Sequence, residues 1–332
     1  MKISFPKDER KRWIDFYRSL SMLMVLWFHT EVYYFGDCVI PYSMYTENAM
    51  AGFFFVSGYL FIPKISIRNV KNTLYSIFRK FFIPYVLFAL FLGITKRLFR
   101  NDTIDLLQIV QSLLTGNASW FISALIVCQL YLLAIRRLIH QKVLFFLACT
   151  LPFLYLALTR HYTNFSIIDG TALSVLFMYA GYLYRTCESS LDALHSKYDI
   201  LLAVLLIVFK WVEWQYQLNM TYYYIAIDVY SLFLADTLLG CLLMVRLMKR
   251  IQQSNRLTNM MEWVGRHTLV FYFLCGGVPM VLSKIANRII GHPHYILFIL
   301  VFGAVFATTS MLTYLLYRIP FIRKHILYIQ CP

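Results

Sequence analysis

Two residues suited to chemistry, Arg18 and His29, lie in one apolar stretch near the start of the chain. Titratable groups inside a membrane span are costly, so they usually have a function there. Eleven residues advance an α-helix by three turns plus about 20°, which puts both side chains on one face, about 16 Å apart. An arginine binds phosphate through a planar fork of donors, and a neutral imidazole can take a proton from a hydroxyl. The spacing therefore predicts one helix with an anion anchor and, deeper in, a general base.

Asp15 lies one turn before Arg18. A carboxylate at this spacing can form an ion pair with the arginine and hold its guanidinium in place. We therefore add Asp15 to the candidate site as a substrate-side residue. The alternative for His29 stays open, because a single histidine in a helix bundle can also be a structural residue that only hydrogen-bonds its neighbours.

A second pair of charges, Lys210 and Glu213, falls inside a later apolar stretch. The two residues are three apart and share a helix face, and opposite charges keep each other ionised in a membrane at the lowest cost. Two interpretations stay open: a structural ion pair that fixes helix packing, or a polar wall for a hydroxylated substrate.

Two acids, Asp228 and Asp236, fall in the next apolar stretch and must face the bundle interior or water. They can bind sugar hydroxyls, relay protons, or pair with Lys210 or Arg18. By contrast, we expect Glu31, Asp37 and Glu47, in the outer connecting segments, to be solvated.

A basic segment that includes Arg79 and Lys80 precedes another apolar stretch and Pro84. Its charge can simply reflect membrane topology, in which cytoplasmic loops are basic. It can also dock a polyanionic cytoplasmic cofactor, with Arg79 and Lys80 at the mouth of a cavity. Trp120, at the start of a further apolar stretch, is most simply an interfacial anchor and is also kept as a candidate substrate contact.

The elements that position these residues are membrane helices, because 60% of the 332 residues are hydrophobic and only 14% are charged. A soluble domain averages about 25% charged residues. We predict one all-α domain over 1–332, a polytopic transmembrane helix bundle without a separate soluble domain. About ten spans are expected: 14–35, 47–63, 76–96, 119–139, 142–159, 170–185, 198–217, 224–245, 265–285 and 294–317. A short amphipathic helix is expected over 104–115, lying on the outer surface.

The orientation follows from the basic residues. Most of the 31 Lys and Arg residues fall in the segments on the same side as the two termini. Cytoplasmic loops carry this excess, so both termini are predicted to be cytoplasmic. Arg18 is then near the cytoplasmic surface and His29 in the outer half of the membrane.

Several function classes find no support in the sequence. The net charge of +15 is spread over the loops and forms no single face, which argues against nucleic-acid binding. The chain has no Gly-x-Ser-x-Gly, His-Glu-x-x-His or phosphate-cradling Gly-rich motif. Its seven cysteines match no metal or disulfide spacing. No metal site is predicted.

Five short motifs, in this order, resemble those of the integral-membrane acyltransferase-3 family, which includes sugar and polysaccharide O-acetyltransferases. They are Trp13-x-Asp15-x-x-Arg18 followed by His29, Phe53-Phe54-Phe55-Val56-Ser57-Gly58-Tyr59-Leu60, Arg79-Lys80 before Pro84-Tyr85, Trp120-Phe121, and Gly265-Arg266-His267-Thr268-Leu269-x-x-Tyr272. The chain departs from the family pattern at Ser76, where many members have an arginine, and at Cys275, where many have a histidine.

The resemblance implies an acyl-CoA donor, usually acetyl-CoA, that binds from the cytoplasm, and a carbohydrate hydroxyl as acceptor, such as a surface glycan or a lipid-linked sugar. The motif positions that carry over are Arg18 and His29 as catalytic residues, and Arg18, Arg79 and Lys80 for the donor. We expect a multi-pass protein of the plasma (inner) membrane of a bacterium, with membrane lipids and the glycan as partners and no nucleic acid.

Two rival functions come from different classes. A secondary transporter or channel for an anionic solute would use the intramembrane Lys210, Glu213, Asp228 and Asp236, although the chain shows no repeated half. A non-catalytic assembly partner in envelope synthesis would need none of these residues.

Overall fold

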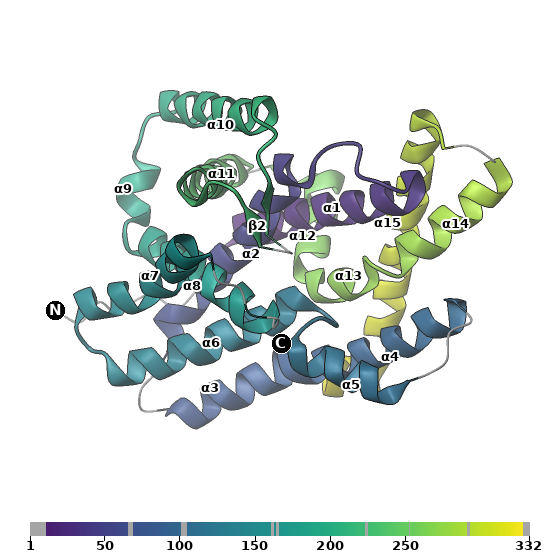
Figure 1. The fold of residues 1–332 in the computed structure, drawn as a ribbon, viewed down its shortest axis with the longest axis horizontal. Helices are drawn as coiled ribbons and strands as arrows, with labels where there is room; N and C mark the ends of the chain where they lie inside the picture. Colours follow the sequence, from purple (N-terminus) through teal and green to yellow (C-terminus); the bar gives the residue numbers. More distant parts are fainter. Residues whose placement is uncertain are drawn as a thin grey trace.

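The computed structural model describes residues 11–65, 69–100, 105–160, 163, 166–222, 225–251, 253–290 and 293–327, and these are mostly helical (Figure 1). The predicted helical fold is confirmed. The helices are α1 (Arg12–Phe35), α2 (Thr46–Phe61), α3 (Val70–Ile77), α4 (Ile83–Arg100), α5 (Leu106–Thr115), α6 (Trp120–Leu138), α7 (Lys142–Thr159), α8 (Ser166–Thr186), α9 (Glu188–Asp192), α10 (Lys197–Gln215), α11 (Tyr230–Arg250), α12 (Arg256–Arg266), α13 (Thr268–Leu274), α14 (Val278–Ile290) and α15 (Tyr295–Arg318).

Among the residues that the structure describes, six helical segments are long and apolar enough to cross a membrane, so the chain is a multi-pass membrane protein. They are Val70–Thr95, Trp120–Leu138, Lys142–Thr159, Ile167–Thr186, Tyr230–Arg250 and Tyr295–Arg318. The pair α13 and α14 adds a seventh if it is one span, but it bends by 45° where Gly276 and Gly277 interrupt the predicted helix 265–285. Three further predicted spans correspond to α1, α2 and α10. These helices are shorter or more highly charged than the six segments, so the count of ten stays a prediction.

A two-stranded antiparallel hairpin interrupts the helical pattern. Its strands are β1 (Met220–Thr221) and β2 (Ala226–Ile227), with Met220 opposite Ile227. The predicted span 224–245 therefore begins too early, because α11 starts only at Tyr230. Asp228 is consequently wrong as a helix residue: it is exposed at the end of the hairpin, where its carboxylate accepts a hydrogen bond from the backbone N–H of Asn219.

Helix α1 is the centre of the bundle, since α2, α11, α12, α13, α14 and α15 all pack against it (Figure 1). Two crossings depend on glycine. A Cβ on Gly58 of α2 would overlap the carbonyl oxygen of Met178 on α8, and a Cβ on Gly265 of α12 would overlap that of Asp15 on α1. Backbones approach this closely only where small residues lie at the contact.

The segment from α3 to α4 is one long helix with a π-helical turn at Phe78–Phe82. The turn ends two residues before Pro84, which lacks the N–H that a regular α-helix needs at this point. The predicted amphipathic helix is present as α5. Asp105 caps its start, because the carboxylate accepts hydrogen bonds from the N–H groups of Leu107 and Gln108. Gly116, with a positive φ of 83°, caps its end.

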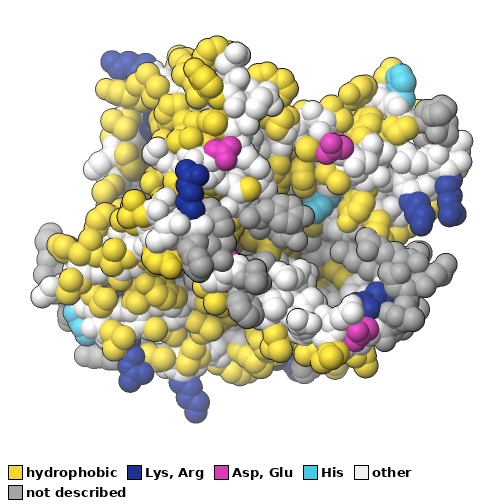
Figure 2. All heavy atoms as spheres, viewed as in Figure 1, with side chains coloured by type: hydrophobic (Ala, Val, Ile, Leu, Met, Phe, Trp, Pro, Cys, Tyr) yellow, Lys and Arg dark blue, Asp and Glu magenta, His cyan; other side chains and the backbone are white. Residues whose placement is uncertain are grey.

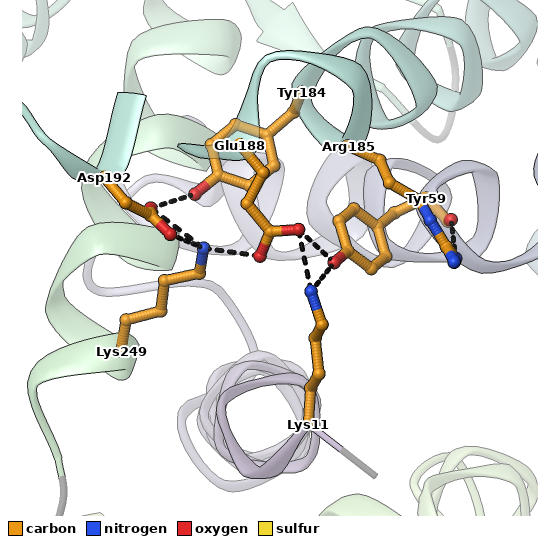
Figure 3. Close-up of polar contacts among 7 residues, drawn as sticks. All are labelled: Lys11, Tyr59, Tyr184, Arg185, Glu188, Asp192 and Lys249. Atoms are coloured by element: carbon orange, nitrogen blue, oxygen red, sulfur yellow. Dashed lines mark hydrogen bonds and ion pairs between the residues drawn. The ribbon is translucent and has the colours of Figure 1, made fainter. Parts of the chain in front are cut away.

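The bundle has one end rich in ion pairs, which we call the basic end. Lys11 lies beside Tyr59 and Glu188, and Lys249 donates hydrogen bonds to Glu188 and Asp192 at 2.7 Å (Figure 3). These contacts join the residue before α1 to the ends of α2 and α11 through the short helix α9. Hydrophobic side chains cover much of the face seen in Figure 2, and the Lys and Arg side chains on it are scattered, most of them near its margins.

The predicted cytoplasmic position of the termini is not tested by these contacts. They do place Lys11, the residue directly before α1, at the basic end, which is the end that charge would put in the cytoplasm.

Candidate functional site

Arg18 and His29 belong to one uninterrupted helix, α1, as the spacing predicts. Both side chains are half-buried. Because the helix starts at the basic end, Arg18 is the nearer of the two to that end, and His29 is about 16 Å further along the axis.

The face of α1 between these two residues is closed by packing. Met22, Val25 and Leu26 lie on it and are all buried in the main hydrophobic core. An acyl donor that reached from Arg18 to His29 would therefore have to run between α1 and its neighbouring helices. The three residues on this face of α1 supply no polar group.

His29 sits in an aromatic environment. Its ring stacks near that of Tyr33, with centroids 6.4 Å apart, and meets the edge of Phe28 at 5.6 Å. Phe28 in turn packs edge-on against Tyr42, with centroids 4.9 Å apart. Tyr42 lies in the short helical turn Tyr42–Met44, so the loop after α1 covers the histidine end of the helix.

Lys210 is the centre of a buried ion cluster at the end of the bundle opposite the basic end; we call it the Lys210 cluster. Its ammonium donates to Asp236 at 2.6 Å, to Glu213 at 3.1 Å and to the carbonyl oxygen of Ser43 at 2.6 Å. The predicted pairing of Lys210 with Glu213, and the option that Asp236 pairs with Lys210, are both confirmed. The structure thus brings three of the predicted residues together and leaves Asp228 outside.

Glu47 completes the Lys210 cluster, and the sequence analysis missed it. The expectation that Glu31 and Glu47 are solvated is wrong: their exposed fractions are 2% and 1%, whereas Asp37 is exposed as expected. Glu31 accepts hydrogen bonds from Tyr45 and from the N–H of Ile40. Glu47 accepts one from the N–H of Tyr222 at 3.3 Å and interacts electrostatically with the charges on α10 and α11.

Aromatic residues connect this cluster to Trp120. Tyr222 packs edge-on against Trp120 at 5.3 Å and hydrogen-bonds Ser174 at 2.6 Å. Tyr272 lies 3.3 Å from the hydroxyl of Ser119, next to Trp120. Three motif residues of the resemblance, His29, Trp120 and Tyr272, therefore lie at the same end of the bundle.

The phenols of this region stay neutral. Burial raises the pKa of Tyr42 well above its ordinary value, and the nearby Glu47 adds to the rise. Burial likewise raises the pKa of Tyr222. Neutral phenols donate hydrogen bonds to carboxylates and to substrate oxygens, so both residues can orient groups beside the Lys210 cluster.

Arg79 and Lys80, the residues predicted to bind the acyl-CoA donor together with Arg18, lie in a different helix. Arg79 belongs to the π-helical turn and donates a hydrogen bond to the hydroxyl of Tyr75 at 3.0 Å, while Lys80 is exposed. Turns of this kind occur frequently at functional sites. Asp15 is buried and lies 3.6 Å from the guanidinium of Arg266 on α12, so it contributes to the contact of α1 with α12.

Two apolar cavities of about 440 and 340 Å³ border the other side of α1 and share Trp27 and Ile40. Trp27 precedes His29 by two residues, which is a rotation of about 200°, so the cavities face away from the histidine. Neither is lined by Arg18, His29 or Lys210. Within the part of the chain that the structure describes, no group of three His, Cys, Asp or Glu residues is arranged to hold a metal ion.

Comparison with known proteins gives one match. A family model described as an acyltransferase domain matches residues 11–318, which is nearly the whole chain. No curated protein and no solved structure matches the chain. The matched range includes α1 with Arg18 and His29, the π-helical turn and the Lys210 cluster.

Proposed function

Because the chain belongs to the acyltransferase-3 family, we propose that it is a membrane-bound O-acyltransferase that moves an acetyl group from cytoplasmic acetyl-CoA to a hydroxyl of a surface or lipid-linked glycan. The observation that carries the proposal is the central helix α1, with the guanidinium of Arg18 towards the basic end and the imidazole of His29 towards the other. One helix thereby spans the path between a cytoplasmic thioester and an outer hydroxyl.

In this proposal Arg18, with Arg79 and Lys80, binds the phosphates of CoA at the basic end. The thioester enters the bundle between α1 and its neighbours, and His29 removes the proton of the acceptor hydroxyl as that oxygen attacks the acyl carbon. The C–O bond of the ester forms, the C–S bond breaks, and the thiolate leaves towards the basic end.

The acceptor would lie among the aromatic residues at the opposite end. Trp120 and Tyr272 are half-buried and therefore have accessible ring surface. Lys210 is unsuited to contact the substrate, since its three donors are all used by Ser43, Glu213 and Asp236. The same observation weighs against an anion transporter, because a saturated ammonium offers no donor to a solute.

The test is acetyl transfer by purified protein in lipid vesicles, with labelled acetyl-CoA and an extract of lipid-linked glycans. We expect His29→Ala to lose at least a hundredfold in rate, the order of magnitude of general base catalysis, while it still folds and inserts. The matched control is His140→Ala, at an exposed position between α6 and α7, which should keep full activity. Full activity of His29→Ala would refute the mechanism, and solute uptake without CoA would favour the transporter.

The acceptor needs a separate experiment, the structural analysis of surface glycan from a deletion strain. We expect one ester to be missing, and its identity would give both the acyl group and the sugar position. An unchanged glycan together with inactive purified protein would favour an assembly partner over an enzyme.

A further inference from the structure

The Lys210 cluster has a surplus of negative charge. Its three carboxylates, Glu47, Glu213 and Asp236, come from three different helices and are each 1% exposed. Among the described residues, Lys210 is the only cation in salt-bridge contact with any of them. Full ionisation would set three negative charges against one positive charge in a region that is largely shielded from solvent, and like charges in such a site cannot all remain ionised.

The hydrogen bonds of the cluster show a second deficit. One oxygen of each carboxylate, Oε1 of Glu47, Oε1 of Glu213 and Oδ1 of Asp236, is buried and has no hydrogen-bond partner among the described residues. An ionised carboxylate only accepts hydrogen bonds, whereas a protonated one also donates. Bound protons therefore correct the charge surplus and supply the missing donors at the same time.

We propose that Glu47, Glu213 and Asp236 form a proton-binding site, and that this site receives the proton that the acceptor hydroxyl loses during acyl transfer. The second part rests on the proposed function. The hydroxyl O–H bond breaks, His29 takes the proton and passes it to a carboxylate, and the proton then leaves to outer solvent. The departing thiolate takes a different proton from water at the basic end, so atoms and charges balance.

Ring contacts link the surroundings of His29 to the cluster. The phenyl ring of Phe28 carries no proton, so the transfer from His29 has to pass through the hydroxyl of Tyr42 or through water. The Phe28 ring next to His29 packs against Tyr42, and the phenol of Tyr42 interacts electrostatically with Glu47, Tyr222 and Tyr272. Glu47 is thus the carboxylate of the cluster that faces the histidine side. The other groups that face it are Lys210, Glu213 and Asp236, together with the backbone N–H of Tyr222.

The first test needs no substrate. Infrared spectra of the protein in lipid vesicles at neutral pH should contain the C=O band of a protonated carboxylic acid. Glu47→Gln should weaken or shift this band and should leave the thermal midpoint unchanged or higher, because glutamine is a neutral side chain of the same shape as the protonated acid. Asp37→Asn is the matched control at an exposed acid and should leave the band unchanged. Absence of the band in the unaltered protein would overturn the proton-binding site.

The second test measures acetyl transfer against pH. Glu47→Gln should lower the turnover about tenfold or more and change the pH profile, whereas Asp37→Asn should do neither. An unchanged turnover together with a weakened band would overturn the proton-receiving role. If Glu47→Gln cannot be purified, both measurements are repeated on Glu213→Gln. Loss of folding in both variants would overturn the claim that the cluster carries surplus negative charge. If the unaltered protein transfers no acetyl group, the proposed function fails, and the infrared result still decides the proton-binding site.

Discussion

Replacing Lys210 with methionine is the sharpest test of the Lys210 cluster. The change keeps the length and the apolar stem of the side chain but removes the ammonium that Asp236, Glu213 and the carbonyl of Ser43 share. Three buried acceptors then lose their donor together. Because α10, α11 and the loop before α2 meet at this one group, the variant should loosen all three.

The expected loss follows from burial. The Lys210 side chain is 14% exposed, and the side chains of Glu213 and Asp236 are 1% and 2% exposed, so solvent screens the pair weakly. Removing one partner of a buried ion pair costs about 3–5 kcal/mol, because the other charge stays behind without compensation. Since two carboxylates stay behind here, we expect Lys210→Met to lie at the upper part of this range. The loss should shrink at low pH, where the carboxylates become neutral.

The measurement is unfolding in detergent micelles, followed by tryptophan fluorescence and circular dichroism. The matched control is Lys71→Met on the exposed surface of α3, which should change the free energy of unfolding by less than about 0.5 kcal/mol. A triple variant, Lys210→Met with Glu213→Gln and Asp236→Asn, removes the uncompensated charges and should regain much of the loss.

Two outcomes would refute this reasoning. If Lys210→Met costs as little as Lys71→Met, the ammonium makes no net contribution to folding. If the triple variant is no more stable than the single one, the cost comes from packing around the lysine stem and has no electrostatic origin.

Two other predictions concern the helix crossings and the basic end. Gly58→Val should cost about 3 kcal/mol or more, because a Cβ there overlaps the backbone of α8, whereas Gly303→Ala has open space and should be neutral; thermal melting compares them. Burial raises the pKa of Glu188, but hydrogen bonds from Lys11 and Lys249 outweigh it and hold the pKa below the usual 4.5. The stabilisation is therefore present above pH 4.5 and is lost as pH falls through the lower native pKa; a stability gap between the unaltered protein and Glu188→Gln that persists at pH 2 would contradict this.

The pairing of Lys210 with Asp236 shows where sequence reasoning stops. Lys210 and Glu213 are three residues apart, so helix geometry alone places them together. Asp236 belongs to another helix, and the sequence left it with several candidate partners; only the packing of α10 against α11 selects Lys210.

Glu47 and Asp228 were misplaced for related reasons. Glu47 lies at the start of α2, where local sequence predicts a solvated acid, but the hairpin β1–β2 and the helices α10 and α11 cover it. Asp228 follows an apolar run that matches a helix in composition, and strand pairing of Met220 with Ile227 turns that run into a hairpin. Short apolar runs do not distinguish helix from strand without their partners.

The sequence by itself determined the helical class, the membrane setting and the common face of Arg18 and His29. All three depend on composition and on the 3.6-residue period, which are local properties of the chain. The tertiary structure alone decided that α1 lies at the centre and that the helix face between Arg18 and His29 is closed by packing. It also decided that three acids share one lysine. These features depend on which helices meet, and burial changes the cost of a charge far more than its position in the sequence does.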